Sequence, residues 1–125
     1  MGETEIAAKP RILIVEDEPF IALTLEDILA ELGFDIAGTF SRVTDALDFI
    51  ARETVDGALL DVNLGAQKID PVADLLAERG CPFIFTTGYG RSGIPATHAT
   101  RPVLQKPFRM DQLAAILLTE IPPRG

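Results

Sequence analysis

The chain has 125 residues, of which 47% are hydrophobic and 24% charged, and its formal net charge is −8. This length suits one domain with its own core, and such an acidic surface disfavours binding to nucleic acid. The single cysteine, Cys81, rules out an internal disulfide, and we expect it to be a core residue. No apolar run approaches the about 18 residues that cross a membrane. The N-terminus is unlike a signal peptide. We therefore expect a cytoplasmic protein that contacts neither nucleic acid nor membrane.

Five short segments along the chain are predicted strands. Residues 11–15 form a continuous aliphatic run, which is typical of a strand buried on both faces of a parallel sheet, whereas residues 35–40 are a weaker strand. The predicted strands lie at 11–15, 35–40, 57–61, 82–87 and within 102–108.

Four segments between and after these strands carry apolar residues at helical spacing. The first begins at Pro19, which a first helical turn tolerates, and ends before Gly33. Ser41 and Asp70 are the predicted N-caps of the second and third helices, and Asp111 is predicted to open the last one.

A full helix is not expected after the fourth strand, because residues 89–101 contain Gly90, Gly93 and Pro95. The alternation still predicts an α/β fold of the (βα)₅ type. This fold is a doubly wound, five-stranded parallel sheet, here with a short or irregular fourth helix. The predicted boundaries are a flexible N-terminal tail at 1–9, one domain at 10–121 and a C-terminal tail at 122–125.

Ligand chemistry in such a fold gathers at the carboxyl ends of the strands. That rule brings together Glu16 and Asp17 after the first strand, Asp61 after the third, Thr87 after the fourth and Lys106 after the fifth. Neighbouring carboxylates raise one another's pKa, and a divalent cation relieves the conflict. Oxygen ligands with room for water favour Mg²⁺.

This constellation indicates phosphoryl transfer to a carboxylate, with Asp61 as the nucleophile. Thr87 and Lys106 are predicted to contact the resulting acyl phosphate. The predicted metal ligands are Asp17, Asp61, the backbone carbonyl of Asn63 and, through a water molecule, Glu16.

The segments "LIVEDE", "ALLDVNL", "FIFTTG" and "LQKPF" occur in this order. They resemble the four defining segments of the receiver domain of bacterial two-component response regulators, the CheY-like family, over residues 11–120. The resemblance implies a flavodoxin-like or CheY-like fold, with Asp61 as phosphoacceptor, Thr87 as switch hydroxyl and a cis peptide before Pro107. It also implies a sensor histidine kinase or a histidine phosphotransfer protein as partner. The only catalysis it implies is Mg²⁺-dependent self-phosphorylation and dephosphorylation.

The chain departs from the family's usual pattern in the switch region. Leu64 and Gly65 replace the usual Met-Pro, Ile69 replaces a glycine, and Val103 replaces an aromatic residue on the fifth strand. These departures predict an altered switch, in which we hypothesise that Tyr89 is the moving aromatic residue.

The segment "PFIFTTGYG" is similar to a subset of stand-alone receivers with a Phe-Ala-Thr-Gly-Tyr type motif. Members of that subset are tied to HWE-type histidine kinases and general stress signalling. We therefore expect a single-domain response regulator, a monomer or weak dimer, that signals by protein contact or drains phosphate from a shared kinase.

Two alternatives remain open. The chain can be a receiver fold that makes protein contacts without phosphorylation, or a Mg²⁺-dependent aspartate-nucleophile phosphatase. The phosphatase class needs a second aspartate where this chain has Asn63.

The glycine pattern after the fourth strand and the single histidine are not predicted to be functional sites. The pattern Gly88-x-Gly90-x-x-Gly93 lacks the long helix that a dinucleotide-binding turn needs. His98 lies in a polar loop without a neighbouring acid in the sequence, and we predict a surface histidine.

Overall fold

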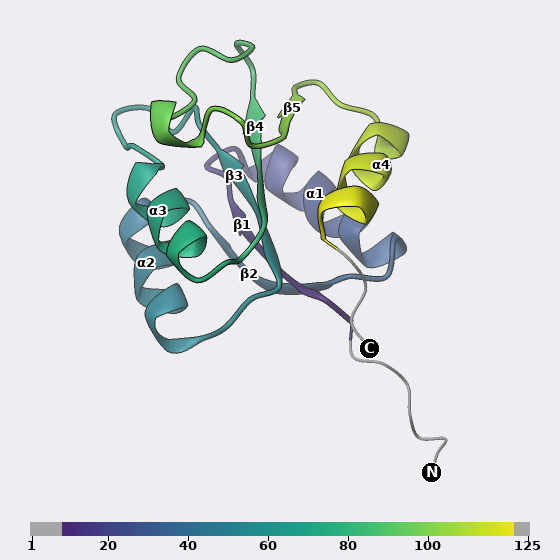
Figure 1. The fold of residues 1–125 in the computed structure, drawn as a ribbon. Coiled ribbons are helices and arrows are strands. Elements are labelled where there is room, and N and C mark those ends of the chain that lie inside the picture. Colours follow the sequence, from purple (N-terminus) through teal and green to yellow (C-terminus); the bar gives the residue numbers. More distant parts are fainter. Residues whose placement is uncertain (1–8, 122–125) are drawn as a thin grey trace.

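A parallel sheet of five strands organises the molecule, in a computed structural model that describes residues 9–121 (Figure 1). The strands are β1 (Arg11–Val15), β2 (Asp35–Phe40), β3 (Gly57–Asp61), β4 (Phe83–Thr87) and β5 (Val103–Gln105). They lie in the order β2-β1-β3-β4-β5 with every pair parallel. This order is that of a flavodoxin-like sheet and confirms the predicted fold class. The predicted tails lie outside the described residues, except for Lys9, and the domain boundaries stay predictions.

Four α-helices cover the two faces of this sheet. They are α1 (Pro19–Glu31), α2 (Val43–Arg52), α3 (Asp70–Glu78) and α4 (Met110–Glu120), the last standing where a fifth helix was predicted. α1 and α4 lie on one face, and α2 and α3 on the other (Figure 1). Within residues 9–121, none of the helices has both the length and the apolar character that crossing a membrane requires.

The period-two geometry of a strand divides the core into two layers. On β1, Leu13 and Val15 face α2 and α3, while Ile12 and Ile14 face α1 and α4. All four side chains are buried, which explains why the strand is apolar throughout. Cys81 is buried in the layer under α2 and α3, as predicted.

The predicted N-cap of α2 is wrong by one residue. The helix is capped by Arg42 rather than Ser41, and the cap makes no side-chain hydrogen bond. The Oε1 atom of Gln67 instead accepts a hydrogen bond from the Val43 N–H at 2.8 Å. A distant side chain thus satisfies an amide that a helix start leaves unpaired.

The predicted starts of α3 and α4 are also displaced, whereas α1 begins at Pro19 as predicted. In α3 the cap is Ile69, and Asp70 is the first helical residue, where its negative charge still suits the helix dipole. In α4 the cap is Arg109, whose N–H donates to Gln112 Oε1 at 2.8 Å, and Asp111 lies inside the first turn.

The connection between β4 and β5 contains only a short 3₁₀ turn, η1 (Ala96–His98). This confirms the irregular fourth helix. The described segment after Gly93 therefore has no long helix that could bind a pyrophosphate, which agrees with rejecting a dinucleotide-binding turn.

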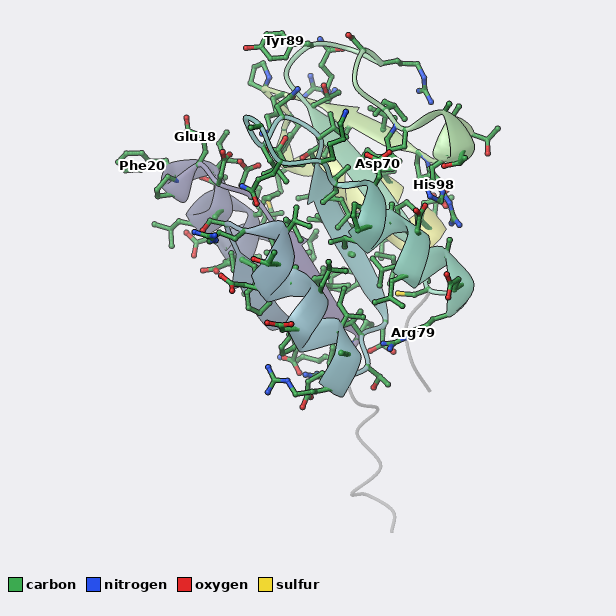
Figure 2. All side chains as sticks on the ribbon, turned by 90° about the vertical axis from the view of Figure 1, so that its left-hand side faces the viewer. Glu18, Phe20, Asp70, Arg79, Tyr89 and His98 are labelled. Atoms are coloured by element: carbon green, nitrogen blue, oxygen red, sulfur yellow. The ribbon has the colours of Figure 1, made fainter. Side chains whose placement is uncertain are left out.

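The prediction of a surface histidine is wrong. The His98 side chain is only 8% exposed, and its ring lies 5.4 Å from the Phe83 ring in an edge-on arrangement. Its Nε2 atom lies 2.7 Å from Asp74 Oδ1 on α3, so His98 bridges η1 and α3 (Figure 2). A three-residue turn has little apolar surface of its own, and the imidazole fills the space against the sheet.

We predict that His98→Ala lowers the free energy of unfolding by about 1–3 kcal/mol, because the substitution leaves a cavity and removes the bond to Asp74. Urea denaturation measures the loss. Thr97→Ala, an exposed change on the same turn, is the control and should stay within about 0.5 kcal/mol of the wild type. Equal midpoints for the two variants would contradict the bridging role.

Candidate functional site

The carboxyl ends of four strands bring all the predicted site residues to one edge of the sheet. Asp61 ends β3 and is buried, while Glu16, also buried, directly follows β1. Thr87 ends β4, and Lys106 follows β5 at a cis peptide bond to Pro107, as predicted. The pocket at this edge is lined by Asp17, Glu18, Ile21, Asp61, Asn63, Gly88, Tyr89 and Lys106.

Lys106 holds the two buried carboxylates together. Its Nζ atom lies 2.9 Å from Glu16 Oε1 and 3.3 Å from Asp61 Oδ1. Burial raises the pKa of Glu16 to about 6, although the hydrogen bond from Lys106 opposes the rise. Burial acts to lower the pKa of Lys106, but the bond to Glu16 and the charge of Asp61 outweigh it and raise that pKa above its ordinary value. The lysine is therefore a fixed positive charge beside Asp61.

The two carboxylate oxygens of Asp61 have different surroundings. Oδ1 accepts a hydrogen bond from the Asn63 N–H at 2.9 Å and lies close to Lys106. Oδ2 is buried and has no hydrogen-bond partner among residues 9–121. A buried carboxylate oxygen without a donor is costly, so this atom has the character of a ligand atom.

The acidic residues at this edge fit a divalent cation. One carboxylate oxygen each from Glu16, Asp17 and Asp61 can be chosen so that the three lie within 4.8 Å of one another. All three are hard oxygen donors of the kind that Mg²⁺ prefers. Glu16 already contacts Lys106 and accepts the Glu18 N–H at 3.1 Å, whereas Asp17 is exposed. Asp17 and Asp61 are the better candidates for direct ligands.

The Asn63 side chain has a role at the site that was not predicted from the sequence. Its Oδ1 atom accepts hydrogen bonds from the Thr87 hydroxyl at 3.2 Å and from the Gly88 N–H at 2.8 Å. The loop after β3 is thereby tied to the end of β4. An asparagine two residues after a strand is an ordinary loop residue, so the sequence gives no signal of this contact.

Tyr89 does not lie inside the site. Its backbone N–H donates to Thr87 Oγ1 at 3.0 Å, but its side chain is exposed and points into solvent at the rim of the pocket (Figure 2). The partly buried Val103 occupies the β5 position where the family often has an aromatic residue. The proposed movement of Tyr89 stays a hypothesis.

Residues 12–118 match the model of the response regulator receiver domain. The chain belongs to this family. The solution structure of SdrG from Sphingomonas melonis Fr1 is 47% identical, with a TM-score of 0.80 over 90% of this chain and 96% of SdrG. SdrG is also known in a BeF₃-activated conformation, at 45% identity, a TM-score of 0.75 and coverage of 90% and 96%.

Two further relatives of this receiver are informative. The phyllosphere-induced regulator PhyR of Methylorubrum extorquens is 33% identical over 110 residues, which are 85% of this chain and 41% of PhyR. A PhyR structure described as a stress response regulator has 30% identity and a TM-score of 0.75, and covers 92% of this chain and 46% of that one. The receiver domain of the sensor histidine kinase PA1611 of Pseudomonas aeruginosa PAO1 has magnesium in its active-site cleft. It is 26% identical, with a TM-score of 0.78 over 91% of this chain and 98% of that one.

The receiver spans only part of its curated relatives, from 41% of PhyR to 56% of the mycobacterial regulator PdtaR. What those longer proteins do as a whole therefore depends partly on segments that the alignments do not reach. The family membership applies to the receiver portion.

We predict that Mg²⁺ raises the melting temperature of this receiver, because a ligand that binds only the folded state stabilises it by mass action. Asp17→Asn should weaken Mg²⁺ binding at least about tenfold, since it removes one charge from the ligand set. Isothermal titration calorimetry measures the binding directly. Asp27→Asn, an exposed acid further along α1, is the control for the loss of surface charge. Equal affinities of the two variants would place the metal elsewhere.

Proposed function

We propose that this receiver accepts a phosphoryl group on Asp61 from the phosphohistidine of a sensor histidine kinase or a histidine phosphotransfer protein. One observation supports this most directly. Asp61 is a buried carboxylate at a strand end, with the Lys106 ammonium 3.3 Å from Oδ1 and with an Oδ2 atom that lacks a hydrogen-bond donor among the described residues. Two neighbouring carboxylates complete a set of ligand atoms for Mg²⁺.

The transfer needs little from the protein beyond position and charge. A carboxylate oxygen of Asp61 forms a bond to phosphorus as the phosphorus–nitrogen bond of the phosphohistidine breaks. The electron pair of that bond stays on the imidazole nitrogen of the donor. Mg²⁺, when bound at Asp17, Asp61 and the backbone carbonyl of Asn63, supplies positive charge to the phosphoryl oxygens. Lys106 supplies a second positive charge from the side of Glu16 and Asp61.

The rim of the pocket favours a protein as the phosphodonor. Phe20, in the first turn of α1, is 82% exposed, and Leu23 lies three residues further on the same side of the helix. Tyr89 is exposed on the loop after β4, across the pocket mouth from α1 (Figure 2). Large apolar side chains exposed around a reactive site are typical of a protein interface.

The similarity to SdrG and PhyR supports a finer proposal. Since 96% of SdrG aligns with this chain, we propose that the receiver acts as a single-domain response regulator in stress signalling. Its output is a protein contact or the removal of phosphate from a shared kinase. The kinase is proposed to be of the HWE type, on the strength of the "PFIFTTGYG" segment.

We predict that the wild type gains the mass of one phosphoryl group with acetyl phosphate and Mg²⁺, and that Asp61→Asn gains none. Intact-protein mass spectrometry measures the gain. Asp45→Asn, which changes an exposed acid on α2, should be labelled like the wild type. Labelling of Asp61→Asn would refute the assignment of Asp61 as the phosphoacceptor.

We also expect no useful turnover of p-nitrophenyl phosphate, because an amide at residue 63 cannot act as a general acid.

We predict that Leu23→Ala slows phosphotransfer from the cognate kinase about fivefold or more, since removing an interface anchor commonly costs over about 1 kcal/mol. Labelling by acetyl phosphate should stay unchanged, because that small donor needs no docking surface. Leu118→Ala is a matched control: Leu118 is 59% exposed against 55% for Leu23, and it lies near the C-terminal end of α4, away from the pocket. Equal effects of the two variants on phosphotransfer would disprove docking at α1.

A further inference from the structure

The Asn63 side chain connects the phosphoacceptor loop to the switch segment. Its Oδ1 atom is shared by two donors, the Gly88 N–H at 2.8 Å and the Thr87 hydroxyl at 3.2 Å. The backbone N–H of the same residue donates to Asp61 Oδ1 at 2.9 Å. A backbone amide only donates, so the atom that faces Gly88 is the carbonyl oxygen of the Asn63 amide. Asn63 therefore contacts the phosphoacceptor through its backbone and the end of β4 through its side chain.

The Thr87 hydroxyl has one proton, and this proton already forms a hydrogen bond. Its oxygen accepts a hydrogen bond from the Tyr89 N–H at 3.0 Å, and its hydrogen is donated to Asn63 Oδ1. Thr87 is fully buried, so water does not offer the hydroxyl another partner. To donate to an oxygen of an acyl phosphate on Asp61, the Thr87 hydroxyl must first break its hydrogen bond to Asn63 Oδ1.

The Gly88 N–H also already donates a hydrogen bond. Gly88, Asn63 and Asp61 all line the same pocket, so this amide belongs to the pocket that would hold a group bound on Asp61. In this structure it donates to Asn63 Oδ1. Both donors at the end of β4 thus have a neutral amide oxygen as their acceptor.

We propose that Asn63 is a positioning residue whose side-chain carbonyl stands in for a phosphoryl oxygen in the unphosphorylated receiver. It occupies the two donors that an acyl phosphate on Asp61 requires, and so it sets the free energy that phosphorylation must supply to switch the loop after β4. The proposal rests on the proposed function of Asp61. A phosphoryl oxygen is anionic and accepts hydrogen bonds more strongly than a neutral amide, so phosphorylation displaces Asn63 from Thr87 and Gly88.

The displacement of Asn63 from Thr87 and Gly88 also frees the loop after β4 to move. While Asn63 holds Thr87 and Gly88, the loop is tied to the segment after β3. Once those donors turn to the acyl phosphate, the Asn63 side chain leaves and the loop loses this tie. The response is then a change of acceptor for two existing donors.

Asn63→Ala tests the proposal, because it removes the amide but keeps the backbone N–H that contacts Asp61 and the backbone carbonyl predicted to bind Mg²⁺. Beryllofluoride, which mimics a phosphoryl group on a carboxylate, is titrated into each variant with Mg²⁺ and followed by NMR. We expect Asn63→Ala to bind beryllofluoride about 2- to 10-fold more tightly than the wild type, since a competing neutral hydrogen bond is lost. Unchanged or weaker binding would overturn the proposal.

Gln67→Ala is the matched control. It removes an amide side chain from the same loop, and that amide bonds to Val43 and Ser41 rather than to β4. We expect it to leave beryllofluoride affinity within about twofold of the wild type. If it tightens binding as much as Asn63→Ala does, the effect is a general loosening of the loop and the proposal fails.

A double-mutant cycle with Thr87→Val locates the effect. If Asn63 acts partly through the Thr87 hydroxyl, the gain in affinity caused by Asn63→Ala should shrink in the Thr87→Val background. A gain of the same size in both backgrounds would show that the Asn63–Thr87 bond has no part in the switch.

Hydrogen exchange without any phosphoryl analogue separates this proposal from the function of Asp61. The Gly88 amide should exchange about 2- to 10-fold faster in Asn63→Ala than in the wild type, because its acceptor is gone. An equal exchange rate would show that Asn63 does not hold the switch. Failure of the wild type to bind beryllofluoride would instead refute the proposed function, while the exchange rates would still decide whether Asn63 holds Gly88.

Discussion

The site depends on the placement of one ammonium group between two buried carboxylates. Lys106 Nζ lies 2.9 Å from Glu16 Oε1 and 3.3 Å from Asp61 Oδ1, and both acids are almost inaccessible to solvent. Burying two carboxylates without a partner would be strongly unfavourable. The three residues follow or end β1, β3 and β5, so the contact forms only when those strands are correctly ordered and registered. In the proposed function, the same arrangement that stabilises the acids positions Asp61 to attack the phosphorus of the donor.

Charged contacts and neutral hydrogen bonds have different roles at this edge of the sheet. Charged contacts among Lys106, Glu16 and Asp61 hold the position at which we propose that a phosphoryl group and a metal ion bind. Neutral hydrogen bonds from Thr87 and Gly88 to Asn63 Oδ1 connect that position to the loop after β4. Because neutral bonds are weaker than charge-assisted ones, the second set can rearrange while the first remains in place. A receiver needs both properties, since its site must be rigid and its response must be reversible.

The region between β4 and β5 shows how the fold tolerates the loss of a helix. The described chain has only the η1 turn between β4 and β5, and His98 of this turn packs on Phe83 and bonds to Asp74 of α3. Arg101 adds a cation–π contact, with its guanidinium carbon 4.2 Å from the centre of the Phe83 ring. The connection is thus anchored near its C-terminal end. Its N-terminal part, which follows Thr87, is tied to the site through Asn63.

The sequence by itself determined the strands, their order along the chain and which residues lie at one edge of the sheet. β1, β2 and β3 have the predicted bounds, because short, largely apolar segments between turn residues have few other structures available to them. The acids, the threonine and the lysine could be placed at one edge because parallel strands direct their carboxyl ends the same way. Only the tertiary structure decided the burial of His98, the start of α2 and the role of the Asn63 side chain. Each of these involves a hydrogen bond between residues 24 positions apart: His98 with Asp74, Val43 with Gln67, and Thr87 with Asn63. Such pairs follow from how the loops pack in space, and no local periodicity or propensity in the sequence encodes them.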